Sequence, residues 1–273
     1  MPFRFSSCRA KSTIGVVTLL VSGVVSAHET WLLPDDFAPP ADSSVEFSMT
    51  SGMGFPALGS GIDQSRIASA TLDDGEKVTN LVPSAAREGA LSLSGFAADS
   101  TSCAAVLLHP RILEIEGDDR VEHYLEEIGA GSEVWDAWET ASQPREWRES
   151  YTKFARTYLA GRASDKNPCW QTPSEARFDI LPISDPSQLK AGDSLRLQLL
   201  FDGKPLANQA IGIVREGDEP GPLLRSDGSG QVVVNTSGRG RHMVYATNLR
   251  PARGDDFNWE SDFVTLTFMV NPS

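Results

Sequence analysis

The sequence has few cysteines and histidines, and it lacks the spacings that mark the common metal and catalytic sites. Its 273 residues include 3 cysteines and 4 histidines. No CxxC pair and no paired Cys/His spacing occurs, which argues against a structural zinc site. No Gly-x-Ser-x-Gly or His-Glu-x-x-His phrase occurs either. The sequence therefore favours a binding protein over an enzyme.

Basic side chains are also scarce. The 24 lysines and arginines are outnumbered by 37 aspartates and glutamates, which gives a formal net charge of −13 at pH 7. Nucleic acids and anionic membranes both require a basic face on the protein that binds them, so this balance argues against both as partners. The acidic excess suits solubility, and it is compatible with binding a cation.

The longest apolar run lies at the amino terminus, and it is too short to span a membrane comfortably, because a spanning helix needs about 20 apolar residues. It occupies residues 14–25, follows a short basic segment and ends at Val25-Ser26-Ala27. Small residues at the −3 and −1 positions complete the layout of a secretory signal peptide. We therefore predict that residues 1–27 are removed, that the mature chain begins at His28, and that it is periplasmic.

Two cysteines remain after this cleavage. They are Cys103 and Cys169, because Cys8 lies within the predicted signal peptide. An even pair of cysteines in an oxidising compartment favours a disulfide, and two unrelated thiols are the alternative.

Short apolar runs predict strands along most of the chain. They occupy residues 45–49, 90–96, 103–108, 194–201, 231–235, 242–247 and 263–270. Asp-Gly pairs at 202–203 and 227–228 indicate hairpin turns. Residues 51–61 are glycine-rich but lack the Lys-Ser/Thr ending of a phosphate-binding loop, so we interpret them as a plain loop.

Residues 118–161 have helical periodicity. Apolar residues at 121, 124, 125 and 128 follow the i, i+3, i+4, i+7 spacing of one helix face. Pro144 can open a second helix, whose apolar stripe runs from Trp147 to Leu159. We therefore predict a mainly β protein in which two β-sandwich domains, of immunoglobulin-like or transthyretin-like type, flank a helical insertion. The amino-terminal domain is 28–166, with its helical segment at about 118–161, and the carboxy-terminal sandwich is 176–273.

Cleavage before His28 would give this residue a free α-amine beside its imidazole. The two nitrogens can chelate one metal ion, because their ordinary pKa values of about 7.7–8.0 and about 6.5 allow both to deprotonate near neutral pH. Nitrogen ligands of this kind suit copper, nickel, cobalt or zinc in the divalent state. A histidine that follows the cleavage site by coincidence is the alternative.

A second histidine would complete such a site, and His242 is the candidate. It lies in a predicted strand and shares a face with Val244 and Ala246, so a buried structural histidine is the alternative. His109 precedes a proline at a strand end, and His123 lies on the predicted helix. We interpret both as surface residues.

Phrases along the chain resemble a bacterial family of periplasmic proteins of unknown function that is often described as the periplasmic component of cobalt or nickel uptake. The matching phrases, in order, are His-Glu-Thr-Trp-Leu-Leu-Pro at 28–34, His-Tyr-Leu-Glu-Glu-Ile-Gly at 123–129, Arg-Glu-Ser-Tyr-Thr-Lys-Phe-Ala-Arg at 148–156, Leu-Pro-Ile-Ser-Asp-Pro at 181–186, Leu-Lys-Ala-Gly-Asp at 189–193, Leu-Phe-Asp-Gly-Lys-Pro-Leu-Ala at 200–207, His-Met at 242–243 and Trp-Glu-Ser-Asp-Phe-Val-Thr-Leu-Thr-Phe at 259–268. The family pattern has histidines at the mature amino terminus and in the late His-Met phrase, which correspond to His28 and His242. Glu260 is either a carboxylate partner of that site or a surface residue beside Trp259. The family often has a basic or glycine-rich linker before the Leu-Pro phrase. This chain has Cys169-Trp170 there instead.

The resemblance implies a periplasmic protein that binds nickel or cobalt through His28 and His242 and passes it to a membrane metal transporter. Two other classes fit the same residues. One is a copper-dependent oxidase that uses the amino-terminal histidine, and the other is an adhesion or assembly module that binds no metal.

Overall fold

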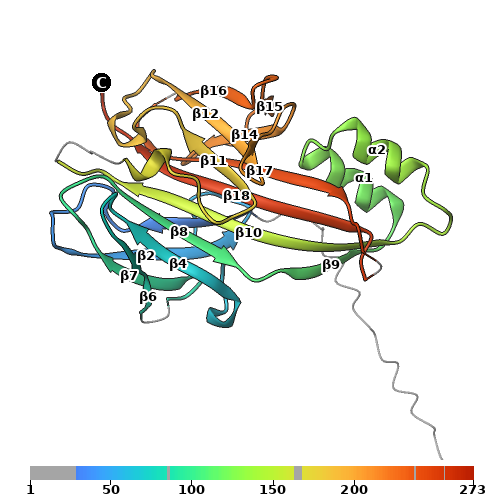
Figure 1. The fold of residues 1–273 in the computed structure, drawn as a ribbon, viewed down its shortest axis with the longest axis horizontal. Helices are drawn as coiled ribbons and strands as arrows, with labels where there is room; N and C mark the ends of the chain where they lie inside the picture. The colour runs from blue at the N-terminus through green and yellow to red at the C-terminus, as the bar shows by residue number, and fades with distance from the viewer. Residues whose placement is uncertain (1–28, 85–86, 163–167, 237, 255) are drawn as a thin grey trace, which may run out of the picture.

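The computed structural model describes residues 29–84, 87–162, 168–236, 238–254 and 256–273. The predicted signal peptide and His28 lie outside these residues. Within them the protein is mainly β, as the sequence predicted, with strands in three sheets and two α-helices (Figure 1). No helix in this part of the chain has the length and the hydropathy of a membrane span.

The largest sheet has nine strands, contributed by both halves of the chain (Figure 1). Its order is β15-β14-β17-β18-β10-β8-β4-β5, with β9 paired to β10. These strands are β4 (Ile67–Asp73), β5 (Val78–Asn80), β8 (Ser102–Leu108), β9 (Arg111–Ile115), β10 (Trp147–Leu159), β14 (Ala210–Arg215), β15 (Leu224–Arg225), β17 (Gly240–Pro251) and β18 (Trp259–Val270). The two halves join where β10 and β18 pair in parallel. The predicted boundary between two domains falls in the connection from β10 to β11.

Two smaller sheets cover opposite faces of this central sheet. One contains β1 (Glu29–Pro34), β2 (Ser44–Gly52), β3 (Ser60–Gly61), β6 (Val82–Pro83) and β7 (Leu91–Phe96), and the other contains β11 (Phe178–Pro182), β12 (Ser194–Phe201), β13 (Lys204–Pro205) and β16 (Gln231–Asn235). Consecutive residues of β10 show the arrangement, because side chains alternate between the faces of a strand. Ala155 packs with Phe47 and Leu93 of the first small sheet, whereas Phe154 packs with Leu197 of the second. The result is sandwich-like packing on both faces.

Two helices cover one end of the central sheet (Figure 1). They are α1 (Asp118–Glu127) and α2 (Ser132–Glu139). The apolar stripe predicted for the first helix is buried, and it packs with Trp138 of α2 and with Trp147 and Trp259 of the sheet. Trp147 stacks on Trp259 with ring centroids 4.6 Å apart. Short 3₁₀ turns complete the fold at η1 (Gln64–Arg66), η2 (Cys169–Gln171) and η3 (Pro186–Gln188).

The second predicted helix is wrong. Residues Trp147–Leu159 form β10, a strand of 13 residues at the centre of the large sheet. Its last six residues are all buried, so side chains at consecutive positions are buried on both faces of the strand. Such a run satisfies helical and strand spacing equally. The aromatic and threonine residues of this segment favour the strand.

The remaining strand predictions are confirmed, and so is one of the two predicted hairpin turns. The turn at Asp227-Gly228 does not form a hairpin, because β15 pairs with β14 and β16 pairs with β12. Strands β12 and β16 coincide with the predicted runs at 194–201 and 231–235. The Asp202-Gly203 pair turns between β12 and β13 with both φ angles positive, at 47° and 72°, as a two-residue hairpin of type I′ requires.

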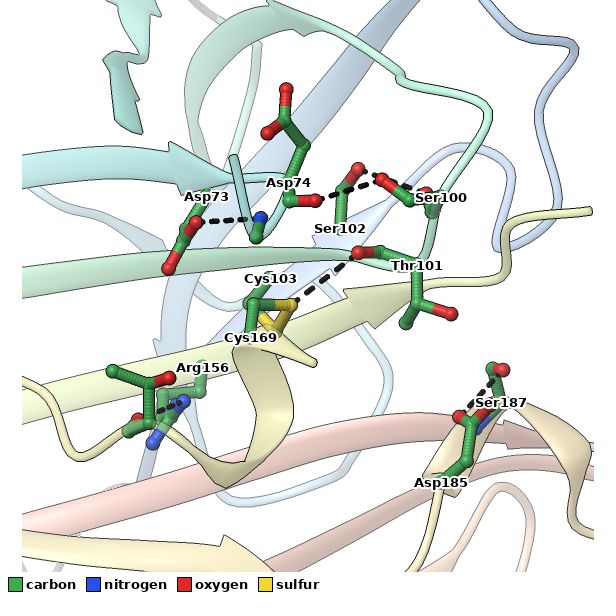
Figure 2. The surroundings of a disulfide bond; sticks show 12 residues. Asp73, Asp74, Ser100, Thr101, Ser102, Cys103, Arg156, Cys169, Asp185 and Ser187 are labelled. Carbon is green, nitrogen blue, oxygen red and sulfur yellow. Dashed lines mark hydrogen bonds between the residues drawn. A yellow bond between two sulfur atoms is a disulfide. The ribbon is translucent and has the colours of Figure 1, made fainter. Parts of the chain in front are cut away.

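The predicted disulfide is present. Cys103 of β8 is bonded to Cys169 of η2, with Cα atoms 5.9 Å apart (Figure 2). The two cysteines are 66 residues apart in the sequence, so the bond closes a long loop. A crosslink of this kind stabilises a fold by about 2–4 kcal/mol, chiefly because it restricts the unfolded chain.

Candidate functional site

A cavity of about 680 Å³ lies beside the start of β1. This volume is within the range of roughly 300–1,000 Å³ that small-molecule sites occupy. Its walls come from β1, the loop after β2, the end of α1, the connection from β14 to β15, and β17. Glu29 and Trp31 line it from β1, and Met243 and Tyr245 line it from β17.

The strand β1 is held firmly in this wall. It pairs with β2 along its length and lies against β10 and β18 of the central sheet. Thr265 and Thr267 of β18 donate hydrogen bonds from their hydroxyl groups to the backbone carbonyls of Thr30 and Leu32, both at 2.6 Å. The first described residue, Glu29, therefore has a defined position at the cavity.

Negative charge dominates the lining of the cavity. Five carboxylates belong to it: Glu29, Glu126, Glu127, Asp218 and Glu219. None of the lining residues is lysine, arginine or histidine within the described part of the chain. A concave site lined by charge of one sign focuses its field, so this cavity attracts cations.

Glu29 is the most perturbed of these carboxylates. Burial raises its pKa, the charge of Lys153 opposes that shift, and the charge of Glu127 adds to it. Burial in turn lowers the pKa of Lys153, whose Nζ lies 5.1 Å from the centre of the Phe263 ring. The Oε2 atom of Glu29 is buried and has no hydrogen-bond partner among the described residues. A cation at this oxygen would favour the charged form of the carboxylate.

A second buried carboxylate, Glu149, lies nearby on β10 and is fully partnered. Its Oε1 accepts a hydrogen bond from the Tyr124 hydroxyl at 3.0 Å and another from the Ser261 hydroxyl. Its Oε2 accepts a hydrogen bond from the indole Nε1 of Trp147 at 2.9 Å. These bonds tie α1 to β10 and β18. We therefore interpret Glu149 as a structural residue, and the signal in the sequence was a glutamate within an apolar stripe.

The structure places His242 away from this cavity wall. Its side chain is buried on β17, with Nδ1 3.0 Å from the carbonyl oxygen of Gly240 and the ring stacked on Phe268 at 5.6 Å. Phe268 packs towards the second small sheet. Alternation along β17 therefore puts His242 on the face opposite Met243 and Tyr245. Its Nε2 has no hydrogen-bond partner in the described structure.

The other candidate residues have different surroundings. His109 and His123 are exposed, as predicted. Glu260 forms an ion pair with Arg250 at 3.0 Å and a longer one with Arg177 at 3.8 Å. These two arginines occupy the Glu260 carboxylate, as expected for a residue with a structural role.

The described residues contain no group of three or more histidine, cysteine, aspartate or glutamate side chains arranged to hold a metal ion. His28 is not among these residues. Sequence reasoning also missed the cavity, because its lining residues come from segments that are far apart in the chain.

Solved structures resemble this chain only remotely. A marsupial T cell receptor is 12% identical, with a match that covers 90% of this chain and 74% of the receptor chain at a TM-score of 0.23. A tetra-tandem repeat from the extending region of a large adhesion protein is 12% identical, with 89% and 49% covered at a TM-score of 0.21. The Escherichia coli adhesin FdeC is 11% identical, with 91% and 65% covered at a TM-score of 0.20.

No curated protein matches the chain. A family described as "Domain of unknown function (DUF4198)" matches residues 25–249, which is most of the sequence. The chain therefore belongs to the DUF4198 family.

Proposed function

We propose that the protein, once its signal peptide is removed, binds a divalent transition metal at the edge of the acidic cavity. One observation carries the proposal. Glu29, the residue after the predicted mature terminus, lines a cavity whose described lining has five carboxylates and no basic side chain. The Cα atoms of neighbouring residues are about 3.8 Å apart, so the amine of a processed His28 would be within reach of the same edge.

The ligands in this proposal are the α-amine and imidazole of His28, with the Glu29 carboxylate as a third donor. An amine and an imidazole suit nickel, cobalt or copper, and a carboxylate is compatible with each. Glu29 supports this set because its Oε2 is buried without a hydrogen-bond partner among the described residues. The geometry favours Glu29 over His242, since the His242 side chain lies on the opposite face of β17. Ligation by His242 stays a prediction.

The wider role that we propose is periplasmic, in nickel or cobalt uptake, with transfer of the metal to a membrane transporter. The signal-peptide pattern and the family resemblance support it. Mass spectrometry of protein recovered from the periplasmic fraction tests the first step, and we expect a chain that begins at His28. A chain that begins elsewhere would remove the chelating amine and with it the proposed site.

Calorimetric titration with nickel tests the site itself. We expect one nickel ion per processed protein. The comparison is a protein with one additional residue before His28, because acylation of the amine removes a ligand while the fold stays intact. We expect its affinity to fall at least tenfold, with an unchanged unfolding midpoint without metal as the control. Equal affinity of the two proteins would rule out the amine, and no binding to either would leave a module that holds no metal.

Copper is the second candidate metal, and one observation favours it. Two methionines, Met53 and Met243, line the cavity, and thioethers prefer the soft Cu(I) ion. A copper-dependent oxidase would then use the same terminal histidine. Peroxide formation by the copper-loaded protein with a reductant and oxygen tests this alternative, and free copper at the same concentration is the control.

A further inference from the structure

The cavity is far larger than a single metal ion, and part of its wall is apolar. A water molecule takes about 30 Å³ in the liquid, so a space of about 680 Å³ would hold about 20 of them. Val214 and Met243 line this space and are buried in one cluster with Phe55. Met53, in the loop after β2, also lines it and is 69% exposed. An apolar cavity of this size with a few polar groups is typical of a site for a small organic molecule.

Tyr245 lies in the middle of the wall that β14 and β17 form. It pairs across the two strands with Gly212, whose neighbours on the same face, Ala210 and Val214, line the cavity. A Cβ atom built at Gly212 would lie only 2.1 Å from Cζ of Tyr245 and 2.4 Å from its hydroxyl oxygen. One side of the phenol ring therefore lies against the backbone of Gly212. Since Tyr245 is a half-buried residue of the lining, the other side of the ring faces the cavity.

Carboxylates lie close to the hydroxyl group of this ring. Burial raises the pKa of Tyr245 to about 12, and the charges of Glu29 and Glu127 add to that rise. The phenol therefore stays protonated at neutral pH. Glu127 is exposed, lines the cavity and is the last residue of α1. The helix ends against this wall, because a Cβ atom built at Gly129 would lie 2.7 Å from that of Ala210.

An ammonium group matches this set of oxygen atoms. It has three N–H donors and no acceptor, and its charge is attracted both by carboxylates and by the face of an aromatic ring. An anion would be repelled by the five carboxylates of the lining. A neutral apolar molecule would fill the space and bring no counter-charge to them.

We propose that this cavity binds an organic cation that carries a primary ammonium group on an aromatic body. The ammonium would donate hydrogen bonds to Glu127, Glu29 and the Tyr245 hydroxyl oxygen. The aromatic body would lie over Met243 and Met53, because thioether sulfur packs favourably against aromatic rings. This ligand goes beyond the proposed metal site, and Glu29 is the one group that the two sites share.

Calorimetric titration of the processed protein without added metal tests the proposal with four probes. Phenethylamine carries both the ammonium and the ring. Phenethyl alcohol has the ring without the charge, methylamine has the charge without the ring, and hydrocinnamate has the ring with the opposite charge. We expect one phenethylamine per protein, bound at least about tenfold more tightly than phenethyl alcohol or methylamine, because charged hydrogen bonds and apolar burial both contribute. Hydrocinnamate should not bind.

Glu127→Gln tests the charge at the ring. It should weaken binding of phenethylamine about tenfold and leave binding of phenethyl alcohol within about twofold. Glu139→Gln is the matched control, because Glu139 is the last residue of α2, is also exposed and does not line the cavity. Its affinity for phenethylamine should equal that of the unmodified protein.

Tyr245→Phe tests the hydroxyl oxygen. It keeps the ring and removes one acceptor, so binding of phenethylamine should weaken about fivefold while binding of phenethyl alcohol changes less. Tyr158→Phe is the control, because Tyr158 is buried and does not line the cavity.

Met53→Ala tests the aromatic body rather than the ammonium. It should weaken phenethylamine and phenethyl alcohol by the same factor, because both ligands carry the same ring. Leu58→Ala is the control, since Leu58 lies in the same loop, is exposed and does not line the cavity. It should change neither affinity.

The protein with one additional residue before His28 separates this site from the metal site. It should bind phenethylamine as tightly as the processed protein does, although its affinity for nickel is expected to fall. If phenethylamine binds and nickel does not, the proposed function fails and the organic-cation site stands. If phenethylamine does not bind, binds no more tightly than phenethyl alcohol, or is weakened equally by Glu127→Gln and Glu139→Gln, the organic-cation site is overturned and the proposed function is unaffected.

Discussion

Two buried charge clusters lie on opposite faces of the central sheet, and their hydrogen bonding differs. On one face Arg156 of β10 donates from Nη1 to both carboxylate oxygens of Asp179 at 2.9 Å. Asp179 also accepts hydrogen bonds from the backbone nitrogens of Ser174 and Ile180, both at 2.8 Å. On the other face Glu29 keeps a buried oxygen without a hydrogen-bond partner in the described structure, and that oxygen belongs to a residue of the cavity lining.

The difference separates structural charge from charge that is available to a ligand. A buried carboxylate whose oxygens are both occupied stabilises one arrangement of the chain and offers nothing to an incoming ion. A buried carboxylate with an unoccupied oxygen beside a cavity has a cost that a cation would offset. Substitutions at Arg156 or Asp179 should therefore have large effects on folding stability. Substitutions at Glu29 should have small effects on stability and large effects on metal binding.

The largest expected effect comes from removing Asp179. Asp179→Ala leaves the Arg156 guanidinium buried without its counter-charge, which costs about 3–5 kcal/mol. Urea unfolding at neutral pH measures the loss. Glu114→Ala is the matched control, because Glu114 pairs with Arg148 at the surface, where such pairs contribute about 0–1 kcal/mol. Similar losses in both variants would contradict the assignment of Arg156 and Asp179 as a structural pair.

The next effect is that of the disulfide. The double variant Cys103→Ala, Cys169→Ala should lose about 2–4 kcal/mol of unfolding free energy. Guanidinium unfolding with and without a reductant measures this loss. The reductant should destabilise the unmodified protein and have no effect on the double variant. A reductant-insensitive unmodified protein would show that the bond does not form in solution.

Glu29→Gln is expected to affect nickel binding more than stability, whereas Asp179→Ala is expected to affect mainly stability. The amide removes a buried carboxylate whose burial is costly, and it also removes a negative charge that interacts with Lys153. These two changes oppose each other, so the unfolding free energy should change by less than about 1 kcal/mol in either direction. Nickel affinity should fall about tenfold, which corresponds to about 1.4 kcal/mol. Glu76→Gln, in an exposed turn, is the control and should change neither quantity. A stability loss as large as that of Asp179→Ala would assign Glu29 to the structural class.

The smallest effect is a pH dependence from His242. Burial lowers the pKa of this ring, the carbonyl of Gly240 opposes that shift, and Arg215 adds to it. A histidine whose pKa is lower in the folded chain binds protons more readily when unfolded. The unfolding free energy should therefore decline as the pH falls below about 6.5, the ordinary pKa of histidine.

His242→Phe tests this dependence, because phenylalanine retains an aromatic ring at the position and cannot be protonated. The slope of unfolding free energy against pH between pH 5 and 6.5 should be smaller in the variant. His123→Phe, at an exposed position, should leave the slope unchanged. Identical slopes in His242→Phe and the unmodified protein would show that the ring does not titrate differently on folding.

The parts of the fold that depend on local pattern were predictable from sequence. The alternation in β12 and β16, the buried face of α1 and the hairpin at 202–203 each follow from the spacing of neighbouring residues. The pairing of Cys103 with Cys169 followed from cysteine number and compartment. The spacing of apolar residues gave a wrong prediction at β10, because a strand buried on both faces has no alternation to distinguish it from a helix.

The cavity and its contrast with the Arg156 cluster required the tertiary structure. Sequence composition determined an acidic, mainly β chain, and local spacing determined many of its strands. Only folding brought the start of β1, the end of α1 and the middle of β17 to one wall, because strand pairing and sheet packing join residues whose separation in the chain is unrelated to their distance in space. For the same reason, only the structure distinguished the occupied carboxylate of Asp179 from the available one of Glu29. The two residues have the same charge in the sequence, and they differ in the hydrogen-bond donors that surround them.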